Sequence, residues 1–336
     1  MTRDLLPGVP LVHSPFFDEV LATSGWDAET RQVATDLNRD GFAVIDFPEP
    51  KLEELAADIA KRVFEPLPWD RWRSGELYEL KVAEAWQTNQ SVRRLAANEK
   101  VIELLSRIYG RQAFPFQTID FAVGSQQPTH SDLIHFASAP DLFMAGVWLA
   151  LEDIREGSGA LMYYPGSHRW PIFYNDHVGR APANLSDPYE DHDRLDRVWA
   201  KLREIYGAEP VLFHPRKGQA LIWAASLHHG GSPHTDKSNT RHSQVTHYFF
   251  EDCAYWTPLM SDPFAGRIAY RTYMKDIATD EPVINAPGGL PVLASFIAMT
   301  APPDSPDRQI GAPLAELRPR RPGLARRMMD ALRGPT

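Results

Sequence analysis

The sequence is poor in three features that would each point to a particular class of protein. It has one cysteine, Cys253, which excludes an internal disulfide framework and any cysteine-based zinc cluster. Its 35 Lys and Arg residues stand against 44 Asp and Glu, a net charge of −9. This balance argues against a general nucleic-acid-binding protein, because phosphate contacts need a basic surface. No stretch approaches the roughly 20 apolar residues of a membrane span, so we expect none.

The first 17 residues lack the continuous apolar segment of a secretory signal peptide, and we expect a cytoplasmic protein. At 336 residues the chain can bury a large core, and its 43% hydrophobic and 24% charged residues are typical of a soluble globular protein. We expect one domain over residues 1–300 and a tail rich in Pro and Arg at 301–336. The tail is either a docked or frayed terminus, which we favour, or a basic arm for a membrane or protein partner. The oligomeric state is left open.

Helical patterns come first in the chain, and strand patterns follow. Amphipathic helices are predicted over 28–38, 52–63, 92–97 and 100–109, with a strand at 41–47. From residue 113, short strands separated by Gly and Pro are typical of an all-β barrel or sandwich. These strands are predicted at 114–123, 143–151, 159–164, 210–214, 219–224 and 241–251. Residues 174–209 interrupt them, with a helix predicted at 193–206, and we interpret this insertion as a lid or substrate wall.

A histidine and a carboxylate two residues apart follow the strand predicted at 114–123. In an extended chain, residues i and i+2 point to the same side, so His130 and Asp132 can reach one metal ion together. Two histidines and one carboxylate suit a non-haem Fe(II) oxygenase, because they leave positions open on the metal. The second histidine is available at His228 or His229, and spacing alone does not choose between them.

Arg241 opens the apolar strand predicted at 241–251. An unpaired buried charge is very costly, so this guanidinium needs an anionic partner. A bound dicarboxylate would supply one through bidentate hydrogen bonds. His130, Asp132, a distal histidine and Arg241 are together the parts of a site for Fe(II), 2-oxoglutarate and O2. The carboxylate at Asp132 favours hydroxylation or a related oxidation over halogenation, which would need a small residue there to leave room for chloride.

The order of these motifs resembles the phytanoyl-CoA dioxygenase family. The resemblance covers residues 27–250 and rests on His130-Ser131-Asp132, Trp148, Gly159-Ala160-Leu161 leading to Pro165-Gly166-Ser167-His168, and His229-Gly230 followed by Arg241. It implies a mostly β fold with flanking helices (α+β), a cupin-like double-stranded β-helix or jelly roll with its core at about 114–250. It also implies that His130, Asp132 and His229 hold iron, that Arg241 binds the distal carboxylate of 2-oxoglutarate, and that Trp148 lies beside this cosubstrate.

Three further residues are candidates for the cosubstrate site. Ser243 lies on the same strand face as Arg241, and we prefer it to Ser232 as the serine that assists the arginine. Gln117 and Thr118 point to opposite faces of their strand, and we favour Gln117 as the one facing inward. Lys81 can contact a carboxylate if a strand at 77–82 borders the site, although aromatic packing is the favoured role of the stretch 66–90.

The remaining histidines are assigned by their surroundings in the sequence. His135 lies close to Asp132 and faces either the substrate or a solvated loop. We interpret the others as structural residues, namely His168, His234, His242 and His247.

The leading hypothesis is a dioxygenase that hydroxylates a small or medium-sized metabolite and releases succinate and CO2. A cupin-type metal-dependent isomerase or hydrolase is the first alternative, and it would not need Arg241 in a buried strand. A non-catalytic binding protein on the same fold is the second, and it would more readily have lost one of the metal ligands.

Overall fold

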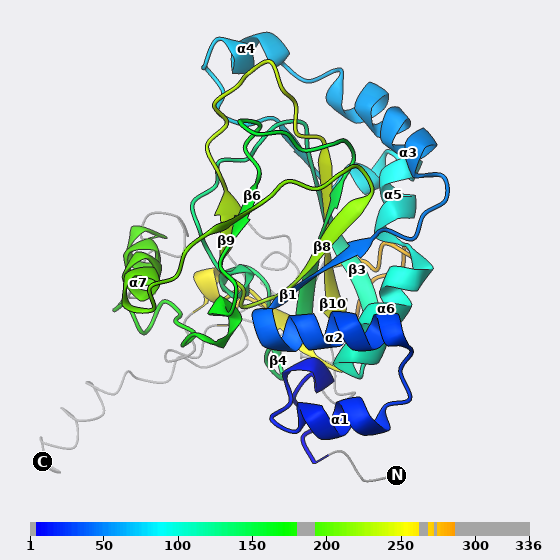
Figure 1. Cartoon of the computed structure of the whole chain (residues 1–336), viewed down its shortest axis with the longest axis vertical. Helices are drawn as coiled ribbons and strands as arrows, with labels where there is room; N and C mark the ends of the chain where they lie inside the picture. The colour runs from blue at the N-terminus through cyan, green and yellow to red at the C-terminus, as the bar shows by residue number, and fades with distance from the viewer. Residues whose placement is uncertain (1–4, 180–191, 262–267, 272–273, 286–336) are drawn as a thin grey trace, which may run out of the picture.

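Two antiparallel β-sheets form the centre of the molecule, and helices cover the outer face of the larger one (Figure 1). The computed structural model describes residues 5–179, 192–261, 268–271 and 274–285, so the tail predicted at 301–336 lies outside the described residues. The larger sheet has the strand order β1-β8-β5-β10-β3-β2, the smaller one is β7-β6-β9, and β11 pairs with β4. This arrangement confirms the predicted jelly roll with flanking helices.

The strands of the larger sheet come from distant parts of the chain, so each brings its own side chains to the interior. Its members are β1 (Phe42–Asp46), β2 (Lys81–Ala83), β3 (Ala113–Phe121), β5 (Met144–Ala150), β8 (Gln219–Ala224) and β10 (Ser243–Phe250). The others are β4 (Ala137–Ala139), β6 (Leu161–Tyr163), β7 (Val211–Phe213), β9 (His229–Gly231) and β11 (Ala254–Trp256). The strands predicted at 41–47 and from residue 114 onward are all present, with ends that differ by at most two residues.

The helices begin and end at residues that the sequence marks. In α2 (Ala28–Asp40), Asp27 accepts a hydrogen bond from the Thr30 N–H at the start, and Gly41 ends the helix with a φ of 83°. This is the expected pairing of an acidic N-cap with a left-handed glycine. The remaining α-helices are α1 (Phe17–Thr23), α3 (Leu52–Ile59), α4 (Trp69–Arg73), α5 (Gln90–Ala96), α6 (Glu99–Tyr109) and α7 (His192–Ile205). Among the helices that the structure describes, none combines the length and the apolar character needed to cross a membrane.

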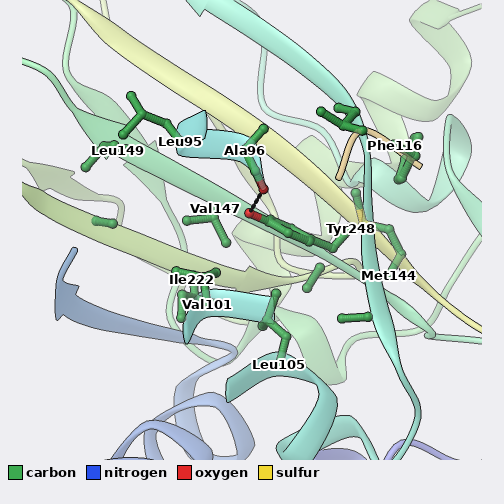
Figure 2. Close-up of a cluster of buried hydrophobic side chains, with 14 of the residues drawn as sticks. Leu95, Ala96, Val101, Leu105, Phe116, Met144, Val147, Leu149, Ile222 and Tyr248 are labelled. Carbon is green, nitrogen blue, oxygen red and sulfur yellow. Dashed lines mark hydrogen bonds between the residues drawn. The ribbon is translucent and has the colours of Figure 1, made fainter. Parts of the chain in front are cut away.

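Side chains alternate along each strand between two apolar layers. On the outer face, Val147, Ile222 and Tyr248 pack against α5 and α6 (Figure 2). On the inner face, a second cluster joins the two sheets, with Trp148 and Val245 from the larger sheet and Leu161 from the smaller. The inner layer therefore forms the wall of the jelly-roll interior, where the candidate site residues also lie.

One hydrogen bond ties the outer layer to the sheet. The Tyr248 hydroxyl, fully buried, donates to the Ala96 carbonyl at the end of α5, at 2.8 Å (Figure 2). We expect Tyr248→Phe to lower the free energy of unfolding by about 1 to 2 kcal/mol, because the buried carbonyl loses its partner. Urea denaturation measures this change, with metal binding as the property that stays constant. An unchanged midpoint would show that this hydrogen bond does not stabilise the fold.

Candidate active site

A cavity of about 600 Å³ opens between the two sheets, a size within the range of small-molecule sites. Seven of the predicted site residues line it: Lys81, Gln117, His130, Asp132, Trp148, His229 and Arg241. The eighth, Ser243, is fully buried, and its Oγ lies 3.3 Å from Arg241 Nη1. The structure thus brings together residues that are spread over more than 160 positions of the sequence.

His130, Asp132 and His229 present three possible metal ligands to one point. One ligand atom from each lies within 4.8 Å of the other two, and all three residues are buried. The Nε2 atoms of His130 and His229 are 3.6 and 3.7 Å from Asp132 Oδ1. Each histidine Nδ1 lies beside a backbone carbonyl, Pro128 O at 2.9 Å and Leu227 O at 3.0 Å. These carbonyls favour the tautomers whose Nε2 lone pairs face the carboxylate, as metal binding requires.

The backbone fixes how close the two histidines come. His130 and His229 form an isolated antiparallel bridge, with N–H to carbonyl distances of 2.9 and 3.0 Å in the two directions. Gly230 allows this approach, because a Cβ atom there would lie 2.7 Å from Gln127 O. Sterics therefore explain why glycine follows the distal histidine, because a larger residue would push β9 away from the loop that carries His130.

The structure separates His229 from its neighbour His228. His228 lies edge-on to the rings of Trp170 and Trp199, at centroid distances of 4.8 and 5.8 Å, and does not line the cavity. Burial lowers its pKa to about 3, with the positive charge of Arg203 acting in the same direction. His228 is therefore a neutral core residue in the folded protein.

The charges of the three candidate ligands suit a cation. Burial alone would raise the pKa of Asp132, but the neighbouring imidazoles of His229 and His130 hold it well below its usual range. Burial lowers the pKa of His229, although Asp132 opposes this. Burial also works against a charged His130, but the adjacent carboxylate of Asp132 raises its pKa. An ionised carboxylate between two imidazoles is the donor set of a divalent metal site.

Two residues outside the predicted set contact the other oxygen of Asp132. The Trp223 indole donates a hydrogen bond from Nε1 to Asp132 Oδ2 at 2.7 Å. His247 Nε2 lies 3.7 Å from the same oxygen, and its Nδ1 lies 3.0 Å from Gln117 Oε1. His247, which we interpreted as a structural residue, therefore also borders the candidate site. The alternation that puts Ser243 on the cavity face also puts His247 there, whereas no sequence signal singled out Trp223.

Arg241 is a buried cation surrounded by neutral partners. It lies two residues before β10, so the expectation that it opens this strand was wrong by two positions. Its Nη1 donates to Ser243 Oγ and its Nη2 to Val123 O, both at 3.3 Å. Its Nε has no hydrogen-bond partner among the residues described, and neither does Trp148 Nε1 nearby. Burial lowers the pKa of Arg241 to about 10, against the opposing charges of Glu152 and Glu79.

The remaining candidates differ in whether they line the cavity. Lys81 begins β2 and forms an ion pair with Glu79 at 2.7 Å, so it already has an anionic partner. Gln117 faces the cavity and Thr118 does not, which is the orientation we favoured. His135 lines the cavity, whereas His234 accepts a hydrogen bond from Gly124 N–H and His168 Nε2 lies 3.1 Å from Asn38 O.

The two segments expected to shape the pocket differ in their contribution. The stretch 66–90 supplies Tyr78, Glu79 and Lys81 to the cavity wall, while Trp72 and Trp86 are buried in the core. In the insertion, residues 174–179 and 192–209 are described, and none of them lines the cavity. Instead, α7 packs through Leu195 and Trp199 on Ile134 and Leu259. The role of 174–209 as a lid stays a prediction.

Comparison with known proteins bears directly on this site. The sequence profile of the Phytanoyl-CoA dioxygenase (PhyH) family matches residues 37–243, more than half of the chain. The chain belongs to this family. The predicted resemblance is thereby confirmed, and the matched range contains the eight predicted site residues, while His247 lies four residues beyond it.

The curated relatives that match this chain have low sequence identity to it. Rat peroxisomal phytanoyl-CoA dioxygenase is 28% identical over 122 residues, covering 32% of this chain and 34% of the rat protein. Mouse phytanoyl-CoA dioxygenase domain-containing protein 1 is 25% identical over 185 residues, covering 53% of this chain and 60% of the mouse protein. The matches thus span less than two thirds of the length of these relatives.

A solved structure supports the fold assignment. The epimerase SnoN, crystallised with Fe³⁺, α-ketoglutarate and nogalamycin RO, superposes with a TM-score of 0.51 at 18% sequence identity. The superposition covers 79% of this chain and 96% of SnoN. At this identity the likeness concerns the fold, and the function must be argued from the cavity itself.

Proposed function

We propose that this protein is an Fe(II)- and 2-oxoglutarate-dependent dioxygenase that hydroxylates a small or medium-sized molecule. One observation carries the proposal. A single cavity contains both a buried His-Asp-His group able to hold a metal and a buried arginine without a carboxylate partner among the described ion pairs. A metal-dependent isomerase or hydrolase of cupin type would need the first feature but not the second.

Iron would be held by His130, Asp132 and His229. Two imidazole nitrogens and one carboxylate oxygen form the facial donor set that suits Fe(II) and leaves positions for other ligands. The backbone carbonyls at both Nδ1 atoms orient the imidazoles before any metal binds. The two imidazoles, held in this way, and the carboxylate, held by the Trp223 indole, need little rearrangement to bind an ion.

2-Oxoglutarate would be held by Arg241, with Trp148 beside it. Arg241 Nε and Trp148 Nε1 are buried donors without a hydrogen-bond partner among the described residues, and they fit a carboxylate, which accepts several hydrogen bonds at once. Ser243 would support the guanidinium from its other side. Gln117 and Lys81 also line the cavity, and Lys81 would have to share its charge between the cosubstrate and Glu79.

When bound, Fe(II) with 2-oxoglutarate and O2 supplies the oxidising chemistry, in which one oxygen atom enters succinate as CO2 leaves and the other enters the substrate as hydroxyl. The chain itself excludes water and orients the substrate. Phe121, Phe136 and Val245 give the cavity apolar walls, while Gln127 and His135 add polar groups near the metal ligands. The substrate should therefore combine an apolar body with polar substituents, and the cavity volume restricts its size.

The test is conversion of 2-oxoglutarate to succinate by the purified protein. We expect succinate formation that needs Fe(II) and O2 and that rises with certain pools of metabolites, with a product 16 Da heavier than its substrate. Asp132→Ala is the matched control, because it removes the carboxylate ligand and should abolish the signal. If the wild type forms no more succinate than Asp132→Ala under any condition, the proposal is wrong. A substrate that changes without consuming 2-oxoglutarate would favour the isomerase or hydrolase.

A further inference from the structure

We infer that Trp223 is the residue that positions the Asp132 carboxylate for metal binding. This inference rests on the proposed function, since it concerns the ligand geometry of the same site. The indole N–H donates to Asp132 Oδ2, whereas the two histidine Nε2 atoms face Oδ1. One carboxylate oxygen is thus held by a neutral donor, and the other is left for the metal. A residue that hydrogen-bonds to a metal ligand, without binding the metal itself, sets the orientation of that ligand.

The sheet is built to let Trp223 reach this carboxylate. In the register of the larger sheet, Trp223 of β8 lies opposite Gly146 of β5, and Gly146 lies opposite His247 of β10. A Cβ atom at Gly146 would lie 2.2 to 2.7 Å from Cε2, Cζ2 and Nε1 of the indole. No real Cβ atom makes contacts this short, so the ring occupies the space that any other residue would fill. The position of the Trp223 indole therefore depends on glycine at residue 146 of the neighbouring strand.

His247 is the weaker of the two neighbours of Oδ2. Its Nε2 is 3.7 Å from the oxygen, beyond hydrogen-bond distance, compared with 2.7 Å for the indole nitrogen. The position of its ring is set by Gln117, 3.0 Å from Nδ1. His247 therefore borders the carboxylate, while Trp223 makes the directional contact. Trp223 also lies against His229, at a ring-centroid distance of 4.8 Å, so it packs on two of the three candidate ligands.

Trp223→Phe separates a positioning role from simple packing, because it keeps most of the apolar ring and removes the N–H. We expect the affinity for Fe(II), measured anaerobically, and for Mn(II), measured by electron paramagnetic resonance, to fall about 10- to 100-fold. Neither measurement needs turnover. Trp69→Phe is the matched control, since Trp69 also donates an indole hydrogen bond, to Phe64 O at 2.9 Å, but does not line the cavity.

Gly146→Ala tests the same contact without altering the tryptophan. The added methyl group should displace the indole and weaken metal binding to a similar extent. Both changes break the same hydrogen bond, from Trp223 to Asp132. The double variant should therefore bind metal about as well as the weaker-binding of the two single variants, which is a non-additive result. Thermal melts establish that each variant is folded. If Trp223→Phe does not fold, Gly146→Ala decides.

The outcomes distinguish this inference from the proposed function. A wild-type protein that binds neither Fe(II) nor Mn(II) would overturn the proposed function. A wild type that binds metal while Trp223→Phe, or a folded Gly146→Ala, binds with unchanged affinity would overturn the role of Trp223 alone. Loss in these variants with no loss in Trp69→Phe is the result that we expect.

Discussion

Replacing His229 with alanine is expected to abolish specific Fe(II) binding, lowering the affinity by more than about 100-fold. Removing a residue that hydrogen-bonds to a metal ligand typically lowers the metal affinity by about 10- to 100-fold. Loss of the ligand itself should lower the affinity further. The buried, ionised Asp132 would then keep only one imidazole beside Oδ1, that of His130, whose Nε2 lies 3.6 Å away. Anaerobic equilibrium dialysis with Fe(II) measures the loss, and succinate formation should disappear with it.

His228→Phe is the matched control for this experiment. The adjacent imidazole is as deeply buried, but it packs on Trp170 and Trp199 outside the cavity. A phenyl ring of similar size should keep this packing, and the Fe(II) affinity should stay within a factor of about two to three, because the His228 ring shares no hydrogen-bond partner with the candidate ligands in the described structure. Retained Fe(II) binding in His229→Ala, or its loss in a folded His228→Phe, would show that the distal ligand has been misassigned.

Replacing Arg241 with alanine should weaken the binding of 2-oxoglutarate by two to three orders of magnitude and leave metal binding nearly unchanged. Removing one partner of a buried charge pair costs about 2 to 5 kcal/mol, and each 1.4 kcal/mol is a factor of ten. The guanidinium does not contact the metal ligands by any hydrogen bond or ion pair in the described structure. Isothermal titration with 2-oxoglutarate, in the presence of Mn(II) without oxygen, measures the effect directly.

Arg241→Lys adds a second readout. Lysine keeps the charge but lacks the planar fork that binds a carboxylate through two hydrogen bonds, so it should restore only part of the affinity. If Arg241→Ala weakened metal and 2-oxoglutarate binding equally, the arginine would have a structural role instead.

The parts of the site that could be predicted are those encoded locally. His130 and Asp132 are two residues apart in an extended segment, so their side chains share a face whatever the rest of the fold does. His229 is followed by Gly230, whose missing side chain permits the close approach of two segments. The same holds for α2, where Asp27 and Gly41 mark both ends of the helix.

The parts that could not be predicted depend on which strands become neighbours. Trp223 reaches Asp132 only because β8 pairs with β5 at a glycine, and no periodicity in either segment reveals that register. Lys81 lines the cavity and its contact with the cosubstrate stays a prediction, but its ion pair with Glu79 could not be foreseen from the sequence. His247 could have been placed on the cavity face by alternation, whereas its distance from Asp132 required the assembled sheet.

The most direct test of the proposed site for iron and 2-oxoglutarate is the visible absorption of the protein with Fe(II) and 2-oxoglutarate in the absence of oxygen. We expect a weak charge-transfer band that appears only when both are present, is lost in Asp132→Ala, and needs more 2-oxoglutarate to appear in Arg241→Ala. No band in the wild-type protein at saturating concentrations, or the same band in Asp132→Ala as in the wild type, would contradict this expectation.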